Sequence, residues 1–223
     1  MAAMSAPHRP SGILCFDCDS TFITGEVLDL LAEEAGRGEE VAAVTARAMA
    51  GELDFEESLR PGVRALGGVD AAAAGRVAAR LERTPGIEEA VAAARGAGFL
   101  VALASGGFTN VLDNLAPGWG VDHLKANTLE VSDGTFTGRV VGEIVDRQAK
   151  ERELRALAER HGLPMARTVA VGDGANDIDM VTAAGVGVGY DPKPALAGAA
   201  DLVLGSGEMA WVADVVMRLA REA

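Results

Sequence analysis

The sequence predicts an α/β fold in which a doubly wound, parallel, Rossmann-like sheet carries an inserted helical cap domain. Short apolar segments alternate with helical segments along most of the 223 residues, which is the pattern of a parallel sheet covered by helices. One long helical stretch interrupts this alternation after the first strand. Hydrophobic residues make up 49% of the chain, enough for a full core.

The first part of the chain contains one strand and a block of helices. "GILCF" is nearly all apolar, as is typical of a strand buried on both faces. The alanine-rich and glutamate-rich sequence that follows has helical and not strand periodicity. The expected elements are a strand over 12–16, helix from about Glu26 to Leu66, a helix from about Asp70 to Arg83 and, after the break "TPG", a helix from 87.

The second part alternates regularly between strands and helices. "NTLEVSDGTFTGRVV" alternates about Asp133-Gly134 and predicts a β-hairpin over 127–141. The other expected elements are strands 99–105, 168–172, 186–190 and 201–204, and a helix over 147–162 that stops at Gly162. We therefore expect a catalytic core of residues 12–25 and 86–223, with a cap of residues 26–85 that is longer than one crossover needs.

Polar residues stand where the predicted strands end. Ligands of open parallel sheets bind beyond the carboxyl ends of the strands, so these residues are candidates for a site. They are Asp17 and Asp19 after the first strand, Ser105 and Gly106 after the second, Asp173, Asn176 and Asp177 after the third, and Lys150 on the helix before the third.

These residue types suit phosphoryl transfer. Four aspartates at adjoining strand ends repel one another unless a cation joins them, and Asp oxygens suit Mg²⁺. A hydroxyl, glycine amides, an Asn amide and a Lys on the other side suit an anion. A metal ion that faces such donors is the layout of phosphoryl transfer, and an Asp in line with phosphorus can act as the nucleophile.

The motifs "DCDST", "SGG", Lys150 and "GDGANDIDM" resemble those of the haloacid-dehalogenase superfamily of phosphatases, from about Ile13 to Leu219. Within it, "FDCDSTFITGE", "RAMAGELDFEESL", "ASGGF" and "VAVGDGANDIDM" resemble the phosphoserine phosphatase family. The resemblance implies a Mg²⁺-dependent phosphomonoester hydrolase that forms an aspartyl-phosphate and converts O-phosphoserine to serine and phosphate, a step of serine biosynthesis.

The resemblance also implies a role for each matched residue. Asp17 is the expected nucleophile and a metal ligand. Asp19 is the expected general acid and base, with its backbone carbonyl on the metal, and Asp173 and Asp177 complete the metal site. The expected substrate contacts are Ser105, Gly106, Lys150 and Asn176 for phosphate, Glu26 for the amino group, Met49 and Phe55 as the lining of the closed cap, and Arg60 as a candidate for the carboxylate.

The cap departs from the family at one position. The family places an arginine for the substrate carboxylate seven residues after the phenylalanine that matches Phe55, and this chain has Gly62 there. On a regular helix the flanking Arg60 and Arg64 point away from the face of residue 62. Pro61 disfavours helix at Arg60, so a helix that restarts here could bring either arginine to the site.

Three alternatives stay open at this point. The substrate could be another small ester such as phosphoethanolamine, and the enzyme could transfer phosphate to an alcohol. A phospho-acceptor receiver domain also clusters aspartates and a lysine, but it is about half as long and has no cap.

Cys15 and Cys18 lie three residues apart on a strand, so their Cα atoms are about 10 Å apart, which is too far for a disulfide. We therefore expect both cysteines to be small buried residues.

Composition excludes other roles. A net charge of −13 disfavours nucleic-acid binding, and no apolar run reaches the about 18 residues that span a membrane. The polar start lacks the apolar core of a secretory signal, and two cysteines form no disulfide framework. We expect a cytoplasmic monomer or homodimer whose partner is a small phosphorylated metabolite.

Overall fold

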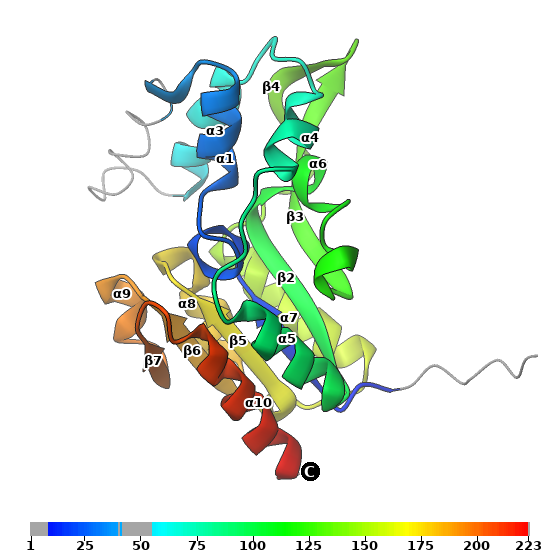
Figure 1. Ribbon diagram of the computed structural model, residues 1–223, viewed down its shortest axis with the longest axis vertical. Coiled ribbons are helices and arrows are strands. Elements are labelled where there is room, and N and C mark those ends of the chain that lie inside the picture. The colour runs from blue at the N-terminus through cyan, green and yellow to red at the C-terminus, as the bar shows by residue number, and fades with distance from the viewer. Residues whose placement is uncertain (1–8, 40, 42–54, 223) are drawn as a thin grey trace, which may run out of the picture.

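A seven-stranded sheet forms the centre of the molecule in the computed structural model, which describes residues 9–39, 41 and 55–222 (Figure 1). The strand order is β4-β3-β2-β1-β5-β6-β7, and all neighbours are parallel except β3 and β4. The strands are β1 (Gly12–Phe16), β2 (Phe99–Phe108), β3 (His123–Ser132), β4 (Thr135–Val141), β5 (Thr168–Gly172), β6 (Val186–Tyr190) and β7 (Leu202–Leu204). This confirms the predicted α/β class.

Helices cover both faces of the sheet, and β1 shows why. Leu14 and Phe16 belong to the core that α5 and α10 cover, whereas Ile13 and Cys15 face α7 and α8. Alternate residues of a strand point to opposite faces, so a strand covered twice must be apolar throughout. The helices are α1 (Val27–Glu34), α3 (Phe55–Ala65), α4 (Ala73–Ala78), α5 (Ile87–Gly96), α6 (Thr109–Leu112), α7 (Arg147–Arg160), α8 (Ile178–Ala183), α9 (Pro194–Ala197) and α10 (Val212–Arg221).

The two cysteines are buried and free. Burial raises the pKa of Cys15 to about 12, and its Sγ lies 3.6 Å from the sulfur of Met180. Burial also raises the pKa of Cys18. Both thiols are therefore held in their neutral form as small packing residues, as the sequence predicts.

The predicted cap segment is residues 26–85, and its described part, residues 26–39, 41 and 55–85, lies beyond the carboxyl edge of the sheet (Figure 1). Two connections lead to it side by side, because Thr84 N donates to Phe22 O at 2.9 Å and Thr24 N donates to Glu82 O at 3.0 Å. The β3–β4 hairpin extends from the sheet to meet it, and Gly68 N donates to Phe136 O at 2.8 Å. Within the cap segment, Arg76 and Arg80 both pair with Glu34 and so join α4 to α1.

Several predicted elements have different bounds in the structure: α1 ends at Glu34, and β3 begins at His123, before the predicted hairpin. The helix expected from Asp70 to Arg83 is wrong in length, because α4 covers only Ala73–Ala78. Its ends are taken by bridges to other segments, Asp70 to Thr135 and Arg83 to Ile23. The second strand continues past Ser105 to Phe108, because β2 pairs with β3 again at Phe108 after a shift in register.

The restart of the helix at Pro61 that the sequence left open does not occur. Helix α3 runs through Pro61 to Ala65 without a break. Gly62 and Val63 are buried, and a Cβ atom on Gly62 would lie 2.7 Å from Leu28 Cδ2 of α1. We attribute the continuity to this close packing of α3 on α1, which offsets the hydrogen bond that proline removes.

Candidate active site

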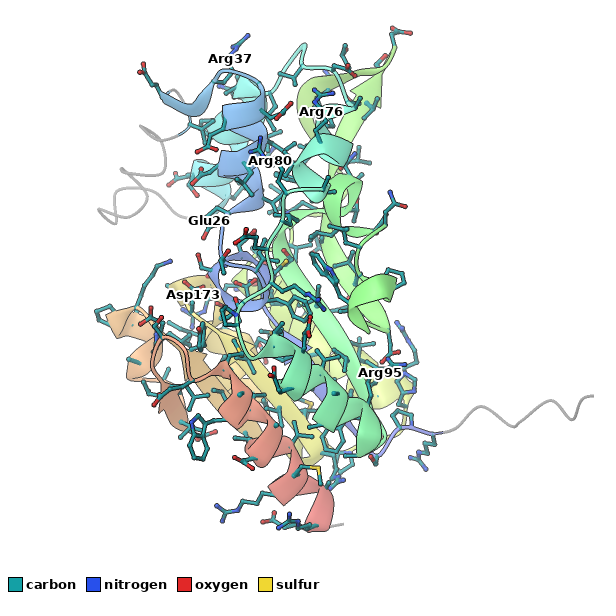
Figure 2. The ribbon with its side chains drawn as sticks, in the orientation of Figure 1. Glu26, Arg37, Arg76, Arg80, Arg95 and Asp173 are labelled. Atoms are coloured by element: carbon teal, nitrogen blue, oxygen red, sulfur yellow. The ribbon has the colours of Figure 1, made fainter. Side chains whose placement is uncertain are left out.

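Carboxylates and lysines meet at the carboxyl ends of β1 and β5. Asp17 follows β1 directly, and Asp173 follows β5. The strands are parallel neighbours, so their ends lie at the same edge of the sheet. Figure 2 shows Asp173 in the core below the cap segment and Glu26 on the cap side of the junction.

A buried lysine joins two of these carboxylates. Lys150, on the first turns of α7, is fully buried, and its Nζ lies 2.6 Å from Asp17 Oδ1 and 2.7 Å from Asp177 Oδ1. Burial alone would lower the pKa of Lys150, but the charges of Asp17 and Asp177 and their hydrogen bonds raise it above its ordinary value. Lys150 therefore stays charged and fixes the orientation of Asp17.

The glycines of "GDGAND" make room for the acidic side chains. Asp177 Oδ2 accepts hydrogen bonds from Asp173 N at 3.1 Å and Gly174 N at 3.0 Å. A Cβ atom on Gly172 would lie 2.5 Å from the Asp177 side chain, and one on Gly174 would lie 2.7 Å from Asn176 Oδ1. The contact at Gly172 is with the Cβ and Cγ atoms of Asp177, so this position of the motif requires glycine for steric reasons.

The carboxylate cluster is suited to a divalent cation. Oxygen atoms of Asp17, Asp173 and Asp177 lie within 4.8 Å of one another and are buried. Burial first, and then neighbouring carboxylates, raise the pKa of Asp17, and burial raises the pKa of Asp173. Three carboxylates face two ammonium groups, Lys150 and Lys193, which leaves one uncompensated negative charge. This excess charge and the all-oxygen donor set fit Mg²⁺.

Asp19 lies in the irregular turn Cys18–Phe22, between β1 and α1. Its Oδ1 accepts a hydrogen bond at 2.9 Å from Val27 N, at the start of α1. Burial, and then the charge of Glu26, raise the pKa of Asp19 to about 8, although the Val27 hydrogen bond opposes this. The next residue, Ser20, has a left-handed φ of 55°, and its hydroxyl donates to Glu26 Oε1 at 2.7 Å. This backbone turn brings Asp19 and Glu26 together.

The "SGG" segment lies beside Asp19. Gly107 N donates to Ser105 Oγ at 2.8 Å, and Ser105 is fully buried. A Cβ atom on Gly107 would lie 3.0 Å from Ser105 Oγ and 3.1 Å from Asp19 Oδ2. The glycine therefore lets the Ser105 hydroxyl approach the Asp19 carboxyl. Asn127 Nδ2 donates to Gly106 O at 2.8 Å from the neighbouring strand β3.

The four residues of the cap segment that were predicted to contact the substrate differ in their outcome. Met49 lies outside the described residues, and Phe55 begins α3. Arg60 forms an exposed ion pair with Glu56, one turn away on the same helix. The structure therefore does not bring Arg60 to the cluster of Asp17, Asp173 and Asp177. Glu26 lies beside a predicted catalytic residue, Asp19.

Two residues that the sequence analysis did not single out join the site. Lys193 Nζ lies 3.1 Å from Asp173 Oδ2, and Lys193 N donates to Asp173 O at 2.8 Å. It follows β6 closely, so the search for polar residues at strand ends could have found it. Asn127 lies inside β3, where no sequence signal marks it.

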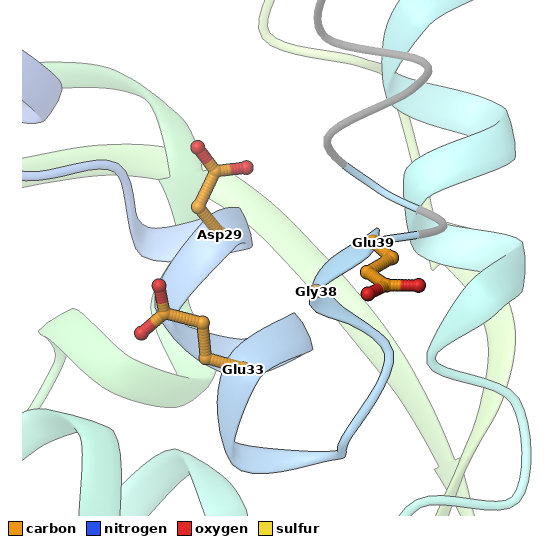
Figure 3. Close-up of a pocket in the computed structure, with 4 residues that line it drawn as sticks. All are labelled: Asp29, Glu33, Gly38 and Glu39. Atoms are coloured by element: carbon orange, nitrogen blue, oxygen red, sulfur yellow. The ribbon is translucent and has the colours of Figure 1, made fainter.

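A separate hollow of about 310 Å³ lies on the cap segment, lined by Asp29, Glu33, Gly38 and Glu39 (Figure 3). Partial burial and the charge of Glu33 raise the pKa of Asp29. The hollow shares no residue with the carboxylate cluster. Its side chains are acidic, so it is unsuited to a phosphate ester.

Comparison with known proteins agrees with this geometry. Residues 14–182 match the haloacid dehalogenase-like hydrolase family. The chain is 48% identical over 200 residues to a phosphoserine phosphatase of Streptomyces coelicolor, covering 90% of this chain and 49% of that protein. It is 46% identical over 183 residues to a phosphoserine phosphatase of Streptococcus thermophilus, covering 82% of this chain and 85% of that protein. The chain thus spans about half the length of the first relative.

A solved structure has the same fold. It is described as a phospho-aspartyl intermediate analogue of phosphoserine phosphatase and superposes with a TM-score of 0.82 at 38% identity, covering 87% of this chain and 93% of that one. The span that matches the family, residues 14–182, includes Asp17, Ser105, Lys150, Asp173 and Asp177. The chain therefore belongs to the haloacid dehalogenase-like hydrolase family.

Proposed function

We propose that this protein is a metal-dependent phosphomonoester hydrolase that uses Asp17 as its nucleophile. The observation that carries the proposal is the buried pairing of Asp17 with Lys150, beside carboxylates that suit a cation. Lys150 engages Asp17 Oδ1, so Oδ2 is the oxygen that attacks phosphorus. The names of the relatives support O-phosphoserine as the substrate.

The proposed reaction has two steps. Asp17 attacks phosphorus and forms an aspartyl-phosphate, while Asp19 gives its proton to the departing alkoxide. Asp19 then takes a proton from water, the water oxygen attacks phosphorus, and the bond to Asp17 breaks to release phosphate. The raised pKa of Asp19, about 8, keeps the carboxyl protonated for the first step near neutral pH.

Asp17, Asp173 and Asp177 would hold Mg²⁺, which when bound neutralises charge on the phosphoryl oxygens. Ser105 and the glycines beside it would donate to the phosphoryl group from the opposite side. Glu26, next to Asp19, would meet the amino group of the substrate. Asn176 follows β5 and Lys193 follows β6. Asn176 would contribute a hydrogen-bond donor, and Lys193 would contribute a positive charge.

One observation favours a second substrate. The position of the expected cap arginine is Gly62, which packs against Leu28, and Arg60 pairs with Glu56. A charge-assisted hydrogen bond to a carboxylate contributes about 1.5–3 kcal/mol, or roughly ten- to over a hundredfold in affinity. A site without that contact would accept phosphoethanolamine, which keeps the amine and lacks the carboxylate.

The test is phosphate release from a set of small phosphomonoesters with Mg²⁺, comparing kcat/KM for O-phosphoserine and phosphoethanolamine. A higher value for O-phosphoserine supports the proposed substrate, and a clear preference for phosphoethanolamine excludes it. Adding an acceptor alcohol and looking for a new ester separates hydrolysis from phosphoryl transfer.

Asp17→Asn should abolish turnover with the fold intact, because an amide cannot attack phosphorus. Phosphate release and the thermal unfolding curve measure the two effects. Asp122→Asn is the matched control, because Asp122 also pairs with a cationic side chain, Arg95 Nη1 at 2.6 Å from its Oδ1, but at the opposite edge of the sheet. Substantial activity in Asp17→Asn would overturn the mechanism.

A further inference from the structure

Asn127 is a buried polar residue in the interior of β3, with 1% of its surface exposed. It pairs with Phe108 just after the register shift in β2, so it lies beside the segment that carries Ser105 and Gly106. A buried amide needs partners for both its donor and its acceptor.

The two ends of the Asn127 side chain reach two different segments. Its Nδ2 donates to Gly106 O at 2.8 Å, and its Oδ1 accepts from Val145 N at 2.9 Å. One partner is a carbonyl and the other an N–H, so only one orientation of the amide satisfies both. The side chain is therefore a fixed bridge between Gly106 and Val145.

The segment at Val145 leads directly to Lys150. The next residue, Asp146, caps α7, with Oδ1 accepting from Ala149 N at 2.7 Å. Lys150 N donates to Asp146 O at 3.0 Å, and Lys150 Nζ contacts Asp17. The position of Val145 thus sets where α7 begins and where its lysine points.

The bridge connects two groups that meet the phosphoryl group in the proposed function, on which this inference rests. Gly106 adjoins Ser105, and Lys150 contacts Asp17. We infer that Asn127 is a positioning residue, which holds the "SGG" segment and the start of α7 at the spacing that a phosphoryl group requires. Displacements of about 1 Å in such groups cost large factors in rate.

The structure contains a matched control in Asn110. It lies on α6, and it too bridges to β3 with both ends of its amide, Nδ2 to Leu129 O at 3.2 Å and Oδ1 from Leu129 N at 2.8 Å. Both of its bonds go to one residue, which has no link to the carboxylates or to Lys150. Asn110 therefore has the same chemistry without the connection to the site.

The experiment compares Asn127→Ala and Asn127→Asp with Asn110→Ala and Asn110→Asp. Asn127→Asp keeps the acceptor for Val145 N but replaces the donor for Gly106 O with a carboxylate oxygen, which repels that carbonyl. Each variant is assayed for kcat, KM, thermal midpoint and the inhibition constant of inorganic phosphate with Mg²⁺ present. Destabilisation alone reduces the number of active molecules, but the remaining molecules bind phosphate normally.

We expect both Asn127 variants to lower kcat at least tenfold and to weaken inhibition by phosphate at least fivefold. The Asn110 variants should stay within twofold of the wild type in both. Inhibition constants for Asn127→Ala and Asn127→Asp that match the wild type overturn the inference, as does an equal loss in the Asn110 variants. If Asn127→Ala does not fold, Asn127→Asp decides on the same criteria.

The two proposals fail in different ways. An active wild type with unaffected Asn127 variants overturns the positioning role and leaves the proposed function standing. A folded wild type that neither hydrolyses any phosphomonoester nor binds inorganic phosphate with Mg²⁺ overturns both.

Discussion

Lys150 shows how one side chain links folding to chemistry. A fully buried ammonium is costly unless opposite charges surround it, and here Asp17 and Asp177 lie within 2.7 Å of its Nζ. The same contacts orient the proposed nucleophile. The contacts of Lys150 with Asp17 and Asp177 therefore serve both the stability of the core and the geometry of the proposed site.

Lys150→Met should lower the free energy of unfolding by about 3–5 kcal/mol, because it leaves two buried carboxylates without their cation. Urea denaturation measures this, and added Mg²⁺ should recover part of the loss. Lys193→Met is the control, because its ammonium is half exposed and its pair with Asp173 should contribute at most about 1 kcal/mol. Equal losses in the two variants would contradict the argument.

At the scale of elements, α1 and the site depend on each other. The first N–H groups of a helix have no partner inside the helix, and Asp19 accepts the one of Val27. Once Asp19 has given up its proton, its carboxylate also interacts favourably with the helix dipole at this end. The start of the cap segment is therefore fixed to the proposed general acid.

Val27→Pro should remove this contact and keep the helix. Proline is tolerated at the first helical position, and Glu26 before it has the extended backbone that proline favours. We expect kcat to fall about tenfold, since Asp19 is ionised when it acts as the base in the second step, and a hydrogen bond to a charged group contributes about 1.5–3 kcal/mol. Val27→Ala is the control, because it trims the side chain but keeps the N–H. If Val27→Ala loses as much kcat, the loss comes from packing.

The packing of α8 on β6 requires a glycine. A Cβ atom on Gly187 would lie 2.4 Å from Val181 O and 2.7 Å from Val181 Cγ1. Gly187→Ala should therefore destabilise the protein by about 1–3 kcal/mol. Gly75→Ala in α4, where nothing lies within 4 Å, should be neutral or stabilise by up to about 1 kcal/mol. Thermal unfolding measures both, and the opposite order would contradict the close approach.

At the scale of the whole molecule, the net charge of −13 has to be compatible with the anionic ester that we propose as the substrate. In the proposed function, Lys150, Lys193 and Mg²⁺ would reverse the field locally, which is how an acidic enzyme can bind phosphate. In the parts of the chain that the structure describes, we found no helix that is long and apolar enough to span a membrane.

Mg²⁺ should stabilise the folded protein, because unfolding separates the carboxylates that hold it. At a hundred times its dissociation constant, a ligand of the folded state adds about 2.7 kcal/mol. The thermal midpoint should rise with Mg²⁺ in the wild type and in Asp122→Asn, but not in Asp173→Asn. The same rise in Asp173→Asn would place the ion elsewhere. EDTA should abolish activity reversibly.

The sequence by itself determined the alternation of strands and helices and the residues at the strand ends. Both follow from local periodicity and from the rule that parallel strands end at one edge of the sheet. "GILCF", "GDGAND" and the hairpin turn at Asp133-Gly134 are such local signals.

Only the tertiary structure decided the rest. The bridge made by Asn127, the pair of Lys193 with Asp173, and the passage of α3 through Pro61 depend on contacts between segments that are distant in the sequence. A short-range pattern carries no information about which amide a buried asparagine will meet. It also cannot show that Leu28 covers Gly62, because that contact exists only once α1 and α3 pack together.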